Sequence, residues 1–131
     1  MGGLRRAQLD NQWLDLREIY SRGYVWAMND IVGNSVDMAP LIDTKAGTSI
    51  RLTIRNETAF PHPMHLHGHH MKLLAVDGEA LDEPYWVDSP LLMPRQNMEF
   101  AFVADNPGKW LFHCHILEHH ASGLGALVRV T

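Results

Sequence analysis

The sequence predicts an all-β fold, a single-domain β-sandwich with Greek-key connections. Several short runs rich in Val, Ile, Leu, Phe and Trp are separated by turn residues, and no helical segments alternate with them. The clearest run, Ser49–Arg55, alternates strictly, and its three apolar side chains are expected to face the core. A chain of 131 residues is long enough to bury one such core.

The remaining elements follow in chain order. The helical spacing of apolar residues over Leu9–Tyr20 predicts a short amphipathic helix or an irregular arm, packed on the domain or across a partner subunit. We therefore divide the chain into an arm, residues 1–22, and a β domain, residues 23–131. The further predicted strands are Tyr24–Met28, His69–Val76, Glu99–Ala104, Lys109–His115 and Ala126–Val130.

Turn residues mark where several of these strands end. Asp77–Gly78 is a two-residue hairpin signal, and Asp105–Gly108 joins a proline that fixes φ to a glycine that permits positive φ. Residues 78–98 are expected to form a long connection, because their three prolines do not fit inside central strands.

The composition excludes some classes of function. The net charge is −4 and no basic block offsets it, which argues against nucleic acid or an anionic membrane as the main partner. No apolar run approaches the roughly 20 residues that a membrane span needs. The first residues lack the apolar region of a signal peptide and the Ser or Thr of a myristoylation signal. A lone cysteine gives no information on the redox compartment.

All nine histidines of the chain lie in two short segments, His62–His70 and His113–His120. The second segment also contains Cys114, the only cysteine. If this segment is extended, Cys114 points to one face and the histidines on either side of it point to the other. Two His-x-His pairs result, His65/His67 and His113/His115. One strand would thus serve two metal centres back to back.

A ligand set for the first centre is His62, Cys114 and His119. A thiolate and two imidazoles with a weak axial group form the blue-copper site, and copper suits this mixture of soft and borderline ligands. About five residues beyond His119, where a Met usually stands, this chain has Leu124. Leucine cannot coordinate, so we expect a three-coordinate site with a comparatively high reduction potential. Other methionines that the sequence leaves open as axial ligands are Met64, Met71, Met93 and Met98.

The second centre would use the two His-x-His pairs, presented outward from adjacent strands. Hydrogen-bonded buried histidines are an alternative, but they explain one such residue more easily than two pairs. Zinc is another alternative, although a structural zinc site needs four ligands and these segments offer at least seven. We expect His69, His70 and His120 in supporting or surface positions. Glu118 is either on the rim where a reductant docks or simply exposed.

At these residues the chain resembles the C-terminal cupredoxin domain of multicopper oxidases, the laccase-like family. His62–His69 is similar to the first histidine motif of that family, and His113–His119 is similar to its last one. Ala104–Trp110 and Tyr24–Asn29 also follow the family pattern. The resemblance covers roughly residues 23–131 and implies a cupredoxin-like Greek-key β-sandwich.

The resemblance implies copper as the cofactor and a role for each ligand. It implies type 1 copper at His62, Cys114 and His119, type 2 copper at His65, and a type 3 copper pair at His67, His113 and His115. In the family, type 1 copper takes single electrons from a phenol, an aromatic amine or a metal ion. The catalytic residues implied are Cys114, His113 and His115, through which the electrons reach the cluster that reduces dioxygen to water.

The chain departs from the family in length. In such oxidases half of the histidines of the cluster come from a different, N-terminal cupredoxin domain, which this sequence lacks. Three hypotheses follow: an electron-transfer module with type 1 copper alone, a cluster completed by self-association of identical chains, or a non-enzymatic copper-binding protein. The sequence fits both a natural single-domain protein and a piece of a longer oxidase.

We favour a copper-dependent, laccase-like oxidase whose activity depends on assembly. The missing N-terminal domain would supply two His-x-His pairs, which is the same pattern as the two pairs of this chain. A two-fold axis through the sheet face that carries these pairs would therefore bring four histidines from each of two identical chains together. A homodimer, a trimer or a hexamer of identical chains would complete the cluster in this way. Scattered methionines favour a phenolic or aromatic amine reductant over cuprous or ferrous ions, with dioxygen as the oxidant. The family implies a periplasmic or extracellular location, although this chain shows no signal peptide.

Overall fold

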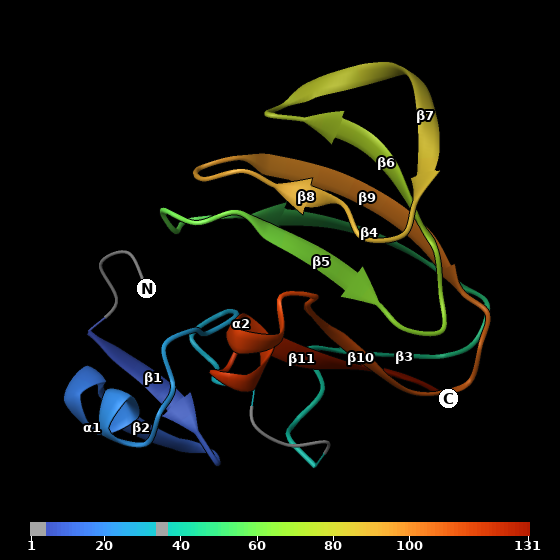
Figure 1. Ribbon diagram of the computed structural model, residues 1–131. Coiled ribbons are helices and arrows are strands. Elements are labelled where there is room, and N and C mark those ends of the chain that lie inside the picture. Colours follow the sequence, from blue (N-terminus) through green and yellow to red (C-terminus); the bar gives the residue numbers. More distant parts are fainter. Residues whose placement is uncertain (1–4, 34–36) are drawn as a thin grey trace.

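The computed structural model describes residues 5–33 and 37–131, which form two packed β-sheets and an N-terminal hairpin (Figure 1). The five-stranded sheet contains, in spatial order, β3 (Ile42–Thr44), β11 (Gly125–Val130), β10 (Gly108–Cys114), β5 (His62–Leu66) and β8 (Leu91–Leu92). The four-stranded sheet contains β4 (Thr48–Arg55), β9 (Asn97–Ala104), β6 (Met71–Val76) and β7 (Glu79–Val87). Most neighbouring strands are not consecutive in the chain, as expected for Greek-key connections. The predicted all-β sandwich is confirmed.

The core lies between the two sheets, because each sheet turns one apolar face inward. In β4 burial alternates as predicted, with the three apolar side chains partly buried and their polar neighbours exposed. Phe100 and Phe102 on β9 and Phe112 on β10 are buried in one cluster. Burying an aromatic side chain contributes about 1.5–3 kcal/mol. This packing fixes β10, the strand that carries Cys114.

The N-terminal segment differs from its prediction. It contains β1 (Arg6–Leu9), β2 (Gln12–Asp15) and α1 (Leu16–Ser21). The helix predicted over Leu9–Tyr20 is therefore wrong for the first half of that range. Asp10 and Asn11 have positive φ angles of 51° and 62°, the backbone conformation of a tight hairpin turn. The helix begins only after Asp15, whose carboxylate accepts a hydrogen bond from a backbone N–H of the first turn.

This N-terminal unit lies beside the sandwich (Figure 1) and has a small apolar cluster of its own. Its buried members are Ala7, Leu9, Ile19 and Val32. The boundary that we place between residues 22 and 23 stays a prediction.

The strand predicted over Tyr24–Met28 is wrong. The segment forms no ladder; the backbone N–H groups of Val25 and Trp26 both donate to the carbonyl of Ser122, at 2.8 and 3.0 Å. Tyr, Val and Trp favour strands because they fit half-buried surfaces. Here Trp26 is buried without pairing in a strand, and Val25 is 42% exposed.

The long connection predicted over residues 78–98 is also wrong, because β7 and β8 lie within it. Asp77 and Gly78 do form the predicted turn, with φ angles of 49° and 81°, and β7 follows at once. Pro84 lies inside β7, which is tolerated because β7 is the edge strand of its sheet and needs hydrogen bonds on one side only.

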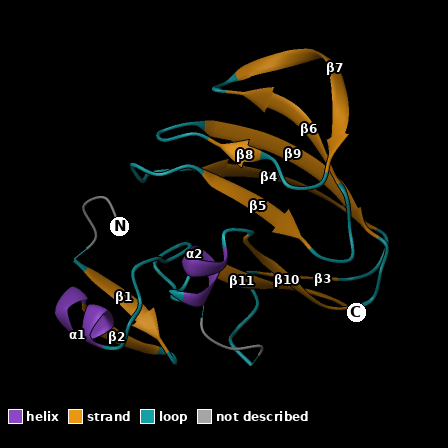
Figure 2. Ribbon diagram, viewed as in Figure 1, coloured by secondary structure: helices purple, strands orange, loops and turns teal. Residues whose placement is uncertain are grey.

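The other predicted strands are found with ends shifted by one or two residues. Figure 2 shows how small the helical part of the chain is, namely α1 and α2 (Leu117–Ala121) in the described residues. In the described part of the chain, no helix is long and apolar enough to cross a membrane.

Candidate metal centres

Strand β10 carries the residues around which two clusters form. Consecutive side chains of a strand point to opposite faces, so Cys114 and His113 lie on different sides of the sheet. His115, just beyond the strand, lies with its ring 5.8 Å from that of His113. We call the first cluster the thiolate site (His62, Cys114, His119) and the second the histidine face (His65, His67, His113, His115).

The thiolate site brings three donor atoms together from three segments. The Cys114 Sγ atom lies 3.6 Å from the Nδ1 atom of His62 and 3.6 Å from that of His119. The two Nδ1 atoms are 3.1 Å apart. Among the described residues, this is the one group of three or more His, Cys, Asp or Glu donors that all lie within 4.8 Å of one another. Their role as metal ligands stays a prediction.

This donor set fits a copper ion. Three donors placed about 2.0–2.3 Å from one ion in a plane would be roughly 3.5–3.8 Å apart. The two Sγ–Nδ1 distances of 3.6 Å lie in this range, and the Nδ1–Nδ1 distance of 3.1 Å is shorter. A thiolate with two imidazoles is the donor set of a blue-copper centre. A structural zinc site would need a fourth donor, and the described residues place no fourth His, Cys, Asp or Glu in the group.

Burial sets the protonation of the thiolate site. It lowers the pKa of His62 to about 4, with the nearby His119 as a second cause, so the ring is neutral at pH 7 and keeps a lone pair for a metal. Burial also raises the pKa of the Cys114 thiol. A metal that binds here must therefore displace the thiol proton.

Leu124 is tied to both ligand segments. It is buried, its carbonyl accepts a hydrogen bond from the Cys114 N–H at 3.1 Å, and its own N–H donates to the His119 carbonyl at 3.0 Å. Of the four methionines that the sequence leaves open, Met64 is the one that lies directly opposite Cys114 in the β5–β10 pair. Leu124, which cannot coordinate, and Met64, which can, are thus the two candidates for the axial position.

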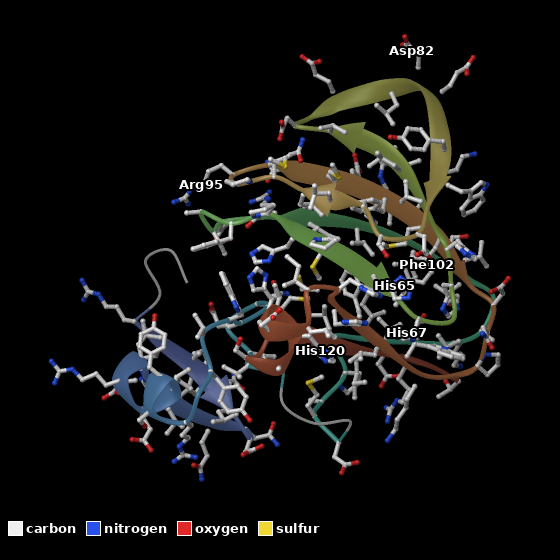
Figure 3. The ribbon with its side chains drawn as sticks, in the orientation of Figure 1. His65, His67, Asp82, Arg95, Phe102 and His120 are labelled. Carbon is white, nitrogen blue, oxygen red and sulfur yellow. The ribbon has the colours of Figure 1, made fainter. Side chains whose placement is uncertain are left out.

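The histidine face gathers on the other side of the same strands. His65 lies directly across from His113 in the antiparallel β5–β10 pair. Ring centroids are 4.7 Å apart for His65 and His67, 5.1 Å for His67 and His113, and 5.6 Å for His65 and His115. Figure 3 shows His65 and His67 near the end of β5, on the side where the chain turns toward β6.

Hydrogen bonds to backbone carbonyls fix the proton of two of these rings. The His65 Nδ1 atom lies 3.2 Å from the Asp88 carbonyl and 3.1 Å from the Ser89 hydroxyl, whose own proton goes to the Asp88 carboxylate. The His113 Nδ1 atom lies 2.8 Å from the Cys114 carbonyl, so Nδ1 carries the proton in each ring. The Nε2 atom of His113 then lies 3.0 Å from the Nε2 atom of His67. Burial lowers the pKa of His113 to about 4 and also lowers that of His67. Neutral imidazoles this close suit a shared cation.

The three remaining histidines differ from one another. The ring of His120 lies 4.4 Å from that of His113, beside Gly125, where a Cβ would approach the His120 ring to 3.4 Å. It therefore places a fifth imidazole next to the histidine face, and the supporting role expected for it stays a prediction. The His69 side chain is 1% exposed, and its Nδ1 atom has no hydrogen-bond partner in the described part of the chain. His70 is 73% exposed.

Residues around the thiolate site were missed by the sequence reasoning. The indole of Trp26, which is 6% exposed, packs against both imidazoles, with centroid distances of 4.8 Å to His62 and 4.7 Å to His119. The Thr58 hydroxyl lies 2.8 Å from the Nε2 atom of His62. The Asn56-x-Thr58 pattern after β4, which is typical of an Asx turn, was the signal that could have pointed to it.

Comparisons with known proteins give the family. The sequence model of the multicopper oxidase family matches residues 9–131. Copper resistance protein A from Escherichia coli is 34% identical over 107 residues, 82% of this chain and 17% of that protein. Multicopper oxidase MmcO from Mycobacterium tuberculosis is 33% identical over 101 residues, 77% of this chain and 19% of that protein.

Similar solved structures belong to the same family. A crystal structure of a multicopper oxidase from Pseudomonas thermotolerans is 36% identical and superposes with a TM-score of 0.67, over 76% of this chain and 25% of that one. The chain spans about a fifth of the length of the curated relatives it matches. The match over residues 9–131, the cupredoxin-like sandwich and the clustered histidines agree: the chain belongs to the multicopper oxidase family, whose cofactor is copper.

Proposed function

We propose that the chain is the copper domain of a laccase-like oxidase, which couples oxidation of a phenol or an aromatic amine to reduction of dioxygen. The observation that carries this proposal is the back-to-back arrangement on β10. Cys114 belongs to the thiolate site, and His113 and His115 belong to the histidine face. Three consecutive residues thus connect a site suited to accepting electrons with a site suited to dioxygen.

The residues divide into ligand sets by cluster. His62, Cys114 and His119 would hold type 1 copper, and copper bound there supplies one-electron redox chemistry. His65 would hold type 2 copper, and the type 3 pair would be held by His67, His113 and His115. The packing of Trp26 on His62 and His119 keeps water away from the buried side of the thiolate site.

The histidine face is incomplete within one chain. In the described residues, no three donors of this face lie within 4.8 Å of one another. A metal ion between His67 and His113 therefore needs further ligands. His67 and His115 are exposed to solvent, so another protein surface could dock against them and supply these ligands. A second copy on a two-fold axis would supply the same His-x-His pairs. Another domain of a longer protein is the other source, since the chain covers about a fifth of its relatives.

The surface near the thiolate site favours an organic reductant. Exposed apolar side chains lie on the segments that carry or pair with the ligands: Phe60, Leu91, Met93 and Leu117. The Phe60 ring is 6.4 Å from the ring of His119. A cleft of about 980 Å³ also reaches His62, and polar and charged residues such as Asp30, Arg55 and Glu57 line it together with Met64 and Leu124. The exposed apolar and aromatic side chains on the ligand segments suit an aromatic ring better than a hydrated metal ion.

The test loads the protein with copper and measures three quantities: copper per chain, native mass by light scattering, and dioxygen consumption with a phenol over a dilution series. We expect clearly more than one copper per chain on a symmetric oligomer, with activity per chain falling as the oligomer dissociates. The variant His115→Ala should lose dioxygen consumption, whereas His70→Ala, outside the face, should keep it. About one copper per chain on a monomer that consumes no dioxygen would overturn completion of the cluster by self-association. A copper-loaded protein that also lacks the thiolate-to-copper absorption would overturn the copper-domain proposal itself.

A second candidate function is electron transfer by the thiolate site alone. It is favoured by the fact that this site, unlike the histidine face, is complete in one chain. The same experiment separates the two, because such a module shows intense thiolate-to-copper absorption without dioxygen consumption. A protein that only buffers copper would bind the metal without that absorption.

A further inference from the structure

The ring of His62 has one nitrogen in the thiolate site and the other in a hydrogen bond outside it. Its Nδ1 atom faces Cys114 and His119, and its Nε2 atom lies 2.8 Å from the Oγ1 atom of Thr58. A neutral imidazole carries one proton, so the partner of Nε2 decides which nitrogen keeps a lone pair.

The orientation of the Thr58 hydroxyl follows from Asn56. The Asn56 side chain is buried, and its amide nitrogen lies 2.7–3.2 Å from the carbonyl oxygens of Phe60, Leu92 and Met93. Carbonyls only accept, so this end of the amide is the donor and Oδ1 is the acceptor. Oδ1 accepts from the backbone N–H of Thr58 at 3.0 Å and from its hydroxyl at 2.8 Å.

The Thr58 hydroxyl has a single proton and two lone pairs, and one lone pair accepts a hydrogen bond from the Phe60 backbone N–H at 3.2 Å. The two oxygens beside it, Asn56 Oδ1 at 2.8 Å and the Phe60 carbonyl at 3.1 Å, can only accept. With the hydroxyl proton donated to either oxygen, the remaining lone pair of Oγ1 faces His62. The proton of His62 then lies on Nε2.

We propose that Thr58, held by Asn56, is a positioning residue that fixes His62 in the Nε2–H tautomer and so keeps the Nδ1 lone pair directed at Cys114 and His119. The consequence for copper rests on the proposed function, but the tautomer itself does not. In the opposite tautomer an N–H group would point into the thiolate site, and the ring would have to change its proton before binding a metal.

The network also fixes the position of His62, because it joins segments from three parts of the chain. The Asn56 N–H donates to the Gln96 carbonyl at 2.9 Å, and the Asn56 amide reaches the carbonyls around β8. His62 itself pairs with Leu92 of β8. The loop after β4 is thereby attached to the strand beside the ligand. Ligand orientation by such hydrogen bonds typically changes metal affinity by about 10- to 100-fold.

The first measurement uses the metal-free protein. Ring nitrogen-15 chemical shifts of His62, recorded near pH 7, should report the Nε2–H tautomer in the wild type and in Thr58→Ser, which keeps a hydroxyl. Thr58→Val keeps the shape but removes the hydroxyl, and should give a mixture of tautomers. Thr48→Val, at an exposed position of β4, is the matched control and should leave His62 unchanged. A predominant Nδ1–H tautomer in the wild type would overturn the proposal, even if the valine variant does not fold.

The second measurement titrates Cu⁺ against a competing chelator and records the absorption of the Cu²⁺ form. Thr58→Val should bind Cu⁺ about 10- to 100-fold more weakly, with Thr58→Ser and Thr48→Val close to the wild type. Equal affinity for the valine variant and the wild type would contradict the positioning role. If the wild type itself binds no copper at the thiolate site, the proposed function fails, and the tautomer measurement still decides the role of Thr58.

Discussion

His113 and Cys114 are neighbours in the chain, yet their side chains end in different clusters. The Nε2 atom of His113 lies 3.0 Å from that of His67, whereas the Sγ atom of Cys114 lies 3.6 Å from the Nδ1 atom of His62. A β-strand produces this separation because consecutive side chains point to opposite faces. The two candidate metal centres are therefore joined by a single peptide bond.

The axial position is tested by exchanging leucine and methionine. Leu124→Met should lower the reduction potential of the copper-loaded thiolate site, because a weak thioether ligand stabilises the cupric form. The swap conserves volume and should cost less than about 1.5 kcal/mol of stability. Met64→Leu, at the position opposite Cys114, is the control and should leave the potential unchanged. A shift for Met64→Leu, measured by redox titration, would show that Met64 is a ligand and that the site is not three-coordinate.

Removing the Trp26 side chain should destabilise the protein strongly. Trp26→Ala leaves a cavity against His62 and His119, and truncating a buried aromatic typically costs about 3–5 kcal/mol. Trp86→Ala is the matched control, because Trp86 is 63% exposed and its ring contacts the ammonium of Lys72. It should cost about 0.5–1 kcal/mol. Urea unfolding of the metal-free variants measures both, and equal losses would contradict the packing role of Trp26.

Gly68, the residue after His67, has no room for a side chain. Its φ angle is +76°, and a Cβ would lie 2.4 Å from the Trp110 ring, which is held by a hydrogen bond from its indole N–H to the Asn106 carbonyl. Gly68→Ala should cost about 1–2 kcal/mol for the left-handed backbone and about 1–3 kcal/mol more for overpacking.

Gly47→Ala provides the comparison for this variant. Gly47 also has a positive φ, of +89°, but no atom lies within 4 Å of the position of its Cβ. Only the backbone cost of about 1–2 kcal/mol is expected there. Thermal unfolding that ranks the two variants equally would show that Trp110 moves aside.

The metal-free protein should lose stability as the pH falls from about 6.5 to about 4. Burial lowers the pKa of His62 and of His113 to about 4, while unfolding restores the ordinary value of 6.5. Within this window the unfolded chain binds more protons, so the free energy of unfolding decreases with falling pH, by up to about 1.4 kcal/mol per pH unit for each histidine. Above pH 6.5 this contribution is fully present.

Substitution of one buried histidine checks the origin of this dependence. His113→Gln should reduce the slope of unfolding free energy against pH between 4.5 and 6.5, as measured by urea unfolding. His70→Gln, at an exposed position, should leave the slope as it is. An unchanged slope for His113→Gln would mean that other groups cause it.

Local periodicity was enough to predict much of the fold and the layout of the site. The alternation of Ser49–Arg55 gave β4 with the correct inward face, because the side chains of a strand alternate whatever its partners are. The same alternation placed Cys114 and His113 on opposite sides before any pairing was known. The close approach of His62, Cys114 and His119 followed from recognising a donor set, since their spacing alone leaves the distances open.

Two of the errors made from the sequence have the same physical cause. β-propensity reports how well a side chain fits a half-buried surface, and it does not report whether the backbone finds a partner strand. Tyr24–Met28 therefore looked like a strand but lies as a loop against Ser122, while β7, with Pro84 inside it, looked like a connection but pairs as an edge strand. The Asp10–Asn11 turn was overlooked because the apolar spacing around it also fits a helix.

The sequence by itself determined the fold class and the two-sided strand and pointed to the candidate metal donors, because these depend on residue type and local spacing. Only the tertiary structure decided what surrounds them: Trp26 on the two imidazoles, Thr58 behind His62, and His120 beside His113. Each of these contacts joins segments whose relative placement depends on how the sheets pack, and no local pattern encodes that placement.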